Sequence, residues 1–123
     1  MKICITSLGK DLSSQVDPRF GRCAYFIIID SETMELEAID NAASASGGGA
    51  GVQSGQLVSE KGVEAVLTGN VGPNAFQALQ AADIEILTGV NGIISDVIEK
   101  YKKGEFKPID SATVESHFGM KLK

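Results

Sequence analysis

The chain has 123 residues, of which 43% are hydrophobic and 22% are charged, and its formal net charge is −5. These values are typical of one globular domain, and no apolar run approaches the ~18 residues that a membrane-spanning helix needs. The acidic balance argues against nucleic acid as a partner, because a nucleic-acid binder needs a basic face. The opening residues 1–7 are too few and too quickly polar for a secretory signal, so we expect a cytoplasmic protein without a membrane segment.

The first part of the chain predicts three strands and one long loop. Residues 2–7 alternate between apolar and polar positions and are rich in β-branched residues, which predicts a strand. Residues 8–22 form a loop, and long connections in compact domains are often functional. Residues 24–30 are almost continuously apolar, which predicts a strand buried on both faces. After a turn, residues 34–38 alternate apolar residues with Glu, and we expect an edge strand in a hairpin with its predecessor.

A glycine-rich tract at 47–51 precedes a change to helix–strand alternation. Glycines let the backbone approach a ligand closely, and a helix predicted over 52–61 would offer unpaired N–H groups to an anion. A flexible loop explains the tract equally well. The tract lacks the patterns of the phosphate loop and of the dinucleotide fingerprint, so we expect no ordinary nucleotide site.

Two more strands and two more helices are predicted in the second half. The strands cover 63–67 and 84–87, one helix starts at Gly72-Pro73, and another carries its apolar face at 94–101 and ends at Gly104. Residues from about 105 to 123 show little periodicity. We therefore expect a single domain, residues 1–123, whose last part is a loosely packed tail.

This element order predicts an α/β fold of ribonuclease-H-like, three-layer α/β/α type. We expect a five-stranded mixed sheet of order 3-2-1-4-5, with strand 2 antiparallel to the others and helices on both faces. Ligands of open α/β sheets bind beyond the carboxyl ends of the strands, where Gly69 and Gly89 follow two predicted strands. A two-metal nuclease needs carboxylates where strand one carries Cys4 and Thr6, and the single histidine, His117, excludes catalysis by a histidine pair.

The segment Asp-Pro-Arg-Phe-Gly-Arg-Cys at 17–23 is the second notable motif. Its two guanidinium groups suit an anion, and they would lower the pKa of Cys23 toward that of a reactive thiol and soft metal ligand. A solvated turn with Cys23 as a small buried residue is the alternative. Cys4 lies in mid-strand and is expected in the core. We take Asp11 and Asp17 to lie in a loop too flexible for a preset metal site.

Three segments in this order carry a family resemblance. They are Asp-Pro-Arg-Phe-Gly-Arg-Cys-x-Tyr-Phe at 17–26, Gly-Gly-Ala-Gly-x-Gln at 48–53, and Gly-Val-x-Ala-Val-x-x-Gly-x-x-Gly-x-x-Ala at 62–75. Together they resemble the dinitrogenase iron–molybdenum cofactor-biosynthesis (nitrogenase accessory factor) family, and most of all its stand-alone, orange-protein-like branch. Members of that family have the ribonuclease-H-like fold. Nitrogenase-linked members carry or insert metal–sulfur precursors, and the orange-protein branch associates with molybdenum–copper–sulfur clusters.

The resemblance implies a non-enzymatic protein that binds, carries or scaffolds an anionic metal–sulfur cluster of the Fe-Mo-S or Mo-Cu-S type. Such a cluster is expected to be labile and absent from purified protein. The implied cofactor-binding residues are Arg19, Phe20, Gly21, Arg22, Gly48, Gly49, Ala50, Gly51, Gln53, Gly69 and Gly89, with Cys23 and His117 as metal ligands. Nitrogen-fixation members often have histidine where this chain has Arg19, which argues against a direct nitrogenase role.

Two other functions remain open. The first is an interaction module that docks onto a partner ATPase or cofactor-assembly protein and has no metal of its own. The second is an enzyme acting on a phosphorylated small molecule, which depends on the glycine tract alone. No general base is apparent near that tract, so the enzyme is the weaker hypothesis.

Overall fold

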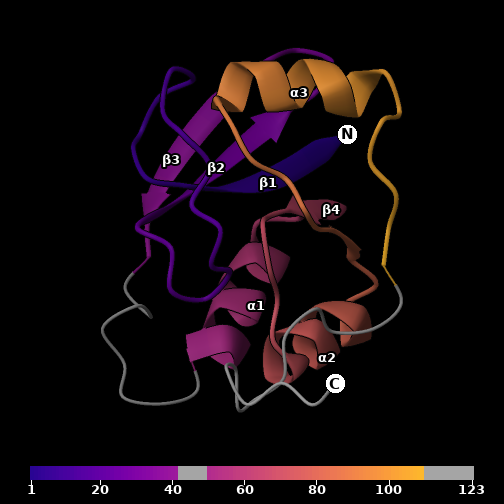
Figure 1. Cartoon of the computed structure of the whole chain (residues 1–123). Helices are drawn as coiled ribbons and strands as arrows, with labels where there is room; N and C mark the ends of the chain where they lie inside the picture. The colour runs from indigo at the N-terminus through magenta and orange to yellow at the C-terminus, as the bar shows by residue number, and fades with distance from the viewer. Residues whose placement is uncertain (42–49, 110–123) are drawn as a thin grey trace, which may run out of the picture.

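The computed structural model describes residues 1–41 and 50–109, and Figure 1 shows their arrangement. The strands are β1 (Lys2–Ser7), β2 (Tyr25–Asp30), β3 (Leu36–Asp40), β4 (Ala65–Leu67) and β5 (Glu85–Leu87), and the helices are α1 (Ala50–Glu60), α2 (Pro73–Ala81) and α3 (Ile94–Lys102). The sheet has the order β3-β2-β1-β4-β5. Strand β2 is antiparallel to β1 and β3, whereas β1, β4 and β5 are mutually parallel. The predicted strand order and the antiparallel second strand are confirmed.

Strands β1 and β2 are buried on both faces and supply side chains to two separate cores. The core under α1 and α2 includes Cys4, Phe26, Ile28, Val58, Val66, Ala75 and Leu79. The core under α3 includes Ile3, Ile5, Ile27, Ile29, Leu67, Ile94, Val97 and Ile98. Figure 1 shows α3 on one side of the sheet and α1 with α2 on the other, which gives the three predicted layers.

Helices α1 and α2 pack closely because small residues face each other. An ideal Cβ built at Gly55 would lie 2.9 Å from the Cβ of Ala78, and one built at Gly51 would lie 3.0 Å from the Cβ of Ala75. Such short contacts favour glycine at both positions of α1. The helix begins at Ala50, two residues earlier than expected, so Gly51 lies within it.

The chain after α3 returns to the free edge of β5. The N–H of Ile109 donates to the carbonyl of Ile86 at 2.8 Å, and Pro108 forms a bridge with Leu87. Phe106 and Ile109 pack against opposite cores. Residues 106–109 are therefore docked on the domain, and residues 110–123 of the predicted tail lie outside the described residues. Within the described ranges, no helix has the length and apolar character to cross a bilayer.

We predict that Gly55→Ala lowers the free energy of unfolding by about 1–2 kcal/mol, because overpacking costs about 1–3 kcal/mol and outweighs the helix propensity gained. Urea denaturation followed by circular dichroism measures the change. Gln56→Ala, at an exposed position of the same helix, is the control and should change stability by less than about 0.5 kcal/mol. Ala78→Gly should restore part of the loss in the double variant. A Gly55→Ala variant as stable as wild type would contradict the close packing.

Candidate functional site

The loop between β1 and β2 lies across the edge where the parallel strands end. The N–H of Asp17 donates to the carbonyl of Thr6 in β1 at 3.0 Å. The N–H of Phe20 donates to the carbonyl of Asn70, which follows β4, at 3.2 Å, and the N–H of Asn70 donates to the carbonyl of Pro18 at 2.8 Å. These bonds attach the loop to two neighbouring strand ends, so it has a defined path.

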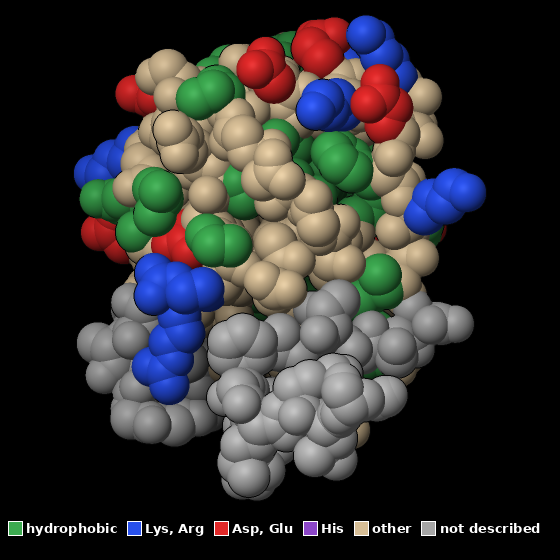
Figure 2. All heavy atoms as spheres, in the orientation of Figure 1, with side chains coloured by type: hydrophobic (Ala, Val, Ile, Leu, Met, Phe, Trp, Pro, Cys, Tyr) green, Lys and Arg blue, Asp and Glu red, His purple; other side chains and the backbone are tan. Residues whose placement is uncertain are grey.

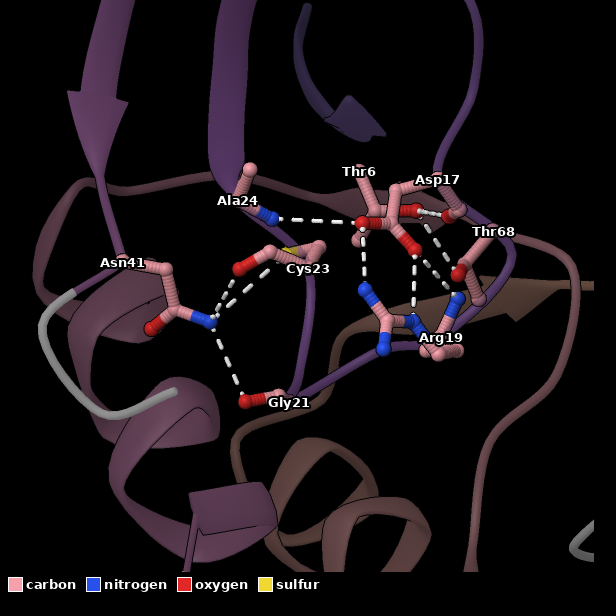
Figure 3. A network of polar contacts seen from close by, with 8 residues as sticks. All are labelled: Thr6, Asp17, Arg19, Gly21, Cys23, Ala24, Asn41 and Thr68. Atoms are coloured by element: carbon pink, nitrogen blue, oxygen red, sulfur yellow. Dashed lines mark hydrogen bonds and ion pairs between the residues drawn. The ribbon is translucent and has the colours of Figure 1, made fainter. Parts of the chain in front are cut away.

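Asp17 is the buried anchor of this loop, as Figure 3 shows. Its side chain is 0% exposed. One carboxylate oxygen, Oδ1, accepts from the backbone N–H and from Nε of Arg19, both at 3.1 Å. The other, Oδ2, accepts from Nη2 of Arg19 and from the N–H of Ala24, both at 3.2 Å. Burial of a carboxylate requires such donors, so our expectation that Asp17 lies in a flexible loop was wrong.

Two buried threonines fasten Asp17 to the sheet. The hydroxyl of Thr6 in β1 donates to the backbone carbonyl of Asp17 at 2.6 Å. The hydroxyl oxygens of Thr6 and Thr68 are 2.8 Å apart, and both residues are fully buried. Because Thr68 directly follows β4, the pair connects the loop to both central strands (Figure 3). The position of the loop is thus set by the rigid part of the fold.

The Asp17 carboxylate holds Arg19 at the surface. The Arg19 side chain is 62% exposed, and hydrogen bonding to Asp17, together with its charge, raises the pKa of the guanidinium. Asp17 engages Nε and Nη2, which leaves the two N–H groups of Nη1 for another acceptor. Arg22 is also exposed, and its backbone N–H donates to the carbonyl of Arg19 at 3.2 Å. Figure 2 shows Lys and Arg side chains together at the lower left, on the side where Figure 1 draws this loop.

Three of the predicted cofactor-binding residues have a structural reason for their identity. Gly21 has a φ of 95°, a left-handed conformation that favours glycine. An ideal Cβ at Gly69 would lie 2.7 Å from the Cα of Pro18, so only glycine lets the loop cross here. Phe20 is 7% exposed, and its ring lies 5.8 Å from that of Phe26. Its side chain therefore anchors the loop in the core.

The start of α3 is already capped. The N–H of Ile94 donates to the carbonyl of Ser14 at 2.9 Å, and that of Ser95 donates to the carbonyl of Leu12 at 3.0 Å. Both acceptors belong to the loop after β1. The positive end of this helix is therefore occupied by the chain itself.

The start of α2 differs from that of α3. Its cap residue, Gly72, makes no side-chain cap, and the first helical bond runs from Phe76 N–H to the Gly72 carbonyl at 2.9 Å. The amides of Asn74 and Ala75 precede that bond and lie at the positive end of the helix dipole. Gly51 of α1 packs against Ala75. The beginnings of two neighbouring helices thus lie together.

Of the two interpretations of Cys23, the structure supports the small buried residue and not the activated thiol. It is fully buried, and burial together with the charge of Asp17 raises its pKa from 9.0 to about 12. A hydrogen bond from Asn41 acts in the opposite direction but is the smaller effect. The expectation that nearby arginines lower this pKa was wrong, because desolvation dominates. Cys4 is buried in the core as predicted, and burial raises its pKa well above the usual value.

The structure brings several predicted site residues together. Arg19, Phe20, Gly21 and Arg22 lie beside Gly69, through a bridge between Arg19 and Asn70. Gly89 is adjacent, because its N–H donates to the carbonyl of Gly69 at 3.0 Å. The residues in the first turn of α1 are Ala50, Gly51 and Gln53. Gly48, Gly49 and His117 lie outside the described residues.

Sequence reasoning missed Asp17, Asn41 and Asn70 as parts of the site. Asp-Pro-Arg carried a usable signal, since Asp side chains often accept from the N–H two residues later. Asn41 and Asn70 carried no such signal. Within residues 1–41 and 50–109, no three His, Cys, Asp or Glu side chains are grouped to hold a metal ion. The donors at this edge are N–H groups and guanidinium groups, which suit an anion.

These features define a three-layer α/β domain with hydrogen-bond donors gathered at the carboxyl edge of its sheet. Residues 1–104 match the model of the family described as Dinitrogenase iron-molybdenum cofactor. The match covers most of the chain, so the protein belongs to this family.

Solved structures agree with this assignment. The apo form of the orange protein from Desulfovibrio gigas is 37% identical, with a TM-score of 0.88 over 91% of this chain and 95% of that one. A Thermotoga protein assigned to the DUF35 family is 36% identical, with a TM-score of 0.79 over 91% of this chain and 96% of that one. A Methanocaldococcus jannaschii protein shares the fold at 18% identity, with a TM-score of 0.65 over 90% of this chain and 96% of that one.

We predict that Asp17→Asn lowers the free energy of unfolding by about 1.5–3 kcal/mol, the usual contribution of hydrogen bonds to a charged group. The amide replaces one acceptor oxygen with a donor that faces N–H groups. Asp11→Asn is the control, because Asp11 is exposed and its acceptor oxygen is kept. Urea denaturation compares the two. Equal stability of both variants would contradict the anchoring role.

We predict that neither cysteine reacts with iodoacetamide in the native protein at pH 8, and that both react in urea, because both thiols are buried and protonated. Mass spectrometry counts the added groups. Rapid alkylation of the native protein would contradict the burial of the thiols.

We also predict that the free energy of unfolding falls as pH rises from about 9 toward 12, because the unfolded chain loses thiol protons that the folded chain keeps. Cys23→Ala should reduce that fall.

Proposed function

We propose that this protein binds and carries an anionic metal–sulfur cluster and catalyses no reaction itself. The observation that carries the proposal is the Asp17-anchored loop, which holds Arg19 and Arg22 exposed at the strand ends of an otherwise acidic domain. The family description, which names the iron–molybdenum cofactor, supports the same class of cargo. We expect the protein to act in the cytoplasm.

The donors at this edge fit such a cargo chemically. Clusters built from metal, sulfide and oxo groups are anions that carry many hydrogen-bond acceptors. Guanidinium groups are cations and backbone N–H groups are dipoles, and both donate hydrogen bonds to such acceptors. At this edge, the local donors are the two N–H groups of Arg19 Nη1 and the first backbone amides of α2. Hydrogen bonds to sulfide would leave the metal–sulfur bonds of a preassembled cluster intact, as carriage requires.

Besides the first amides of α2, we assign the binding residues to two groups. Arg19, Gly21 and Arg22 belong to the loop after β1, and Gly51 and Gln53 belong to the start of α1. The Phe20 side chain serves as a core anchor, so we assign it no direct contact. Gly48, Gly49, Cys23 and His117 stay predictions, as does the choice between an Fe-Mo-S and a Mo-Cu-S cluster.

The test is reconstitution with molybdate, sulfide and either copper or iron, followed by gel filtration and visible absorption. Wild type should retain a coloured, molybdenum-containing species. The double variant Arg19→Ala/Arg22→Ala should bind it at least about 10-fold more weakly, since one hydrogen bond to a charged group contributes about 1.5–3 kcal/mol. Lys100→Ala/Lys103→Ala, at exposed positions at the end of α3, is the charge-matched control and should load normally.

The outcomes separate the alternatives. Equal loading of wild type and the arginine variant would remove the main support for the proposed site. Colourless wild type that still retains a partner ATPase after metal stripping would favour the interaction module instead. Loading lost equally in both double variants would indicate a general charge effect and would contradict the assigned site.

A further inference from the structure

The two groups of proposed binding residues come from distant parts of the chain and are joined by one side chain. The first group lies in the loop after β1, and the second lies at the start of α1. Asn41 follows β3 and is 4% exposed. It contacts the loop, as Figure 3 shows, and it also contacts α1 through Ser54. Its position between them is a feature of the tertiary structure alone.

Asn41 donates hydrogen bonds to the loop. Its Nδ2 donates to the carbonyl of Gly21 at 3.1 Å and to the carbonyl of Cys23 at 2.9 Å. Its backbone N–H donates to the carbonyl of Ala24 at 3.1 Å. Three carbonyl groups on either side of Arg22, one before it and two after it, are thereby held through one residue. The conformation of the loop is thus fixed next to the exposed guanidinium groups.

The acceptor of the same side chain reaches α1. The hydroxyl of Ser54, which is fully buried, donates to Oδ1 of Asn41 at 3.4 Å. Ser54 lies one turn after Ala50, where α1 begins. Only an amide offers two donors for two carbonyls and an acceptor for a hydroxyl at this size. Aspartate has the same shape but would present only acceptors to the two carbonyls.

We propose that Asn41 is the positioning residue that holds the loop at 19–23 and the start of α1 as one anion site. The inference rests on the proposed function and adds a requirement to it. Asn41 is buried and acts through Gly21, Cys23 and Ser54, without touching the cargo. Removing its side chain should therefore weaken binding even though every proposed contact residue is still present.

The first measurement needs no cargo. Hydrogen–deuterium exchange with mass spectrometry is compared for wild type, Asn41→Asp and Asn41→Ala. Exchange should rise in peptides covering 19–24 and in those covering 50–54, and it should be unchanged in α3. Ser54→Ala removes only the hydroxyl that faces Asn41, so exchange should rise in residues 50–54 alone. This milder variant tests the contact with α1 if the Asn41 variants do not fold. Unchanged exchange in 19–24 for both Asn41 variants would overturn the proposal.

The second measurement is loading with molybdate, sulfide and copper or iron. Asn41→Asp should bind the coloured species at least about 10-fold more weakly than wild type, or about 1.4 kcal/mol. Ile98→Ala, a core variant under α3 that destabilises the fold by leaving a cavity, should load normally and controls for destabilisation alone. Asn91→Asp, an exposed amide, is the chemical control. Asn41→Gln should keep part of the binding that Asn41→Asp loses, because glutamine also carries two amide donors.

The results distinguish the two hypotheses. Wild type that loads, with Asn41→Asp loading equally well, would overturn the positioning role and leave the proposed function intact. Loading lost to the same degree in Ile98→Ala would also overturn it, because stability would then explain the effect. Wild type that never loads would refute the proposed function, and this inference with it.

Discussion

The buried carboxylate of Asp17 is the interaction on which the candidate site depends. A long loop without regular structure loses much conformational entropy when it becomes ordered, so it needs strong local bonds. Asp17 supplies four of them within its own loop, and Thr6 attaches its backbone to the sheet. The same carboxylate balances part of the positive charge of Arg19, whose side chain stays exposed. Order in the loop and placement of the donors therefore have one physical cause.

The acidity of the whole domain makes this local arrangement necessary. At a net charge of −5, the long-range field opposes an anion, although salt screens it beyond about 10 Å. Short-range donors act within that distance, so the proposed anion site relies on the guanidinium groups and on the start of α2. The capped start of α3, whose amides bond to Leu12 and Ser14, shows that a helix start alone is insufficient. The local partners of a helix start decide whether its amides are already occupied.

The glycines show how one sequence signal has two physical causes. Absence of a Cβ permits close approach of a ligand and equally of another helix or loop. Gly51 and Gly55 allow α1 to approach α2, and Gly69 allows the loop to cross beside Pro18. A sequence pattern cannot separate these causes, because both require the same missing atom. The close contacts of the folded chain assign packing to these three glycines, and a role of Gly51 in binding remains a separate proposal.

Periodicity along the chain was sufficient to predict the five strands, because burial on one or both faces imposes a local repeat on the sequence. The order of strands and helices along the chain, with the connection rules of α/β folds, then predicted the strand order and the three layers. The arginine motif at 17–23 was also visible, since its residue types suit an anion in any fold. The chemistry of single groups was not. The pKa of Cys23 depends on desolvation, and the roles of Asp17 and Asn41 depend on carbonyls and amides from remote segments. Those surroundings exist only after folding, so only the tertiary structure determined which charged and polar groups are buried and how they are held.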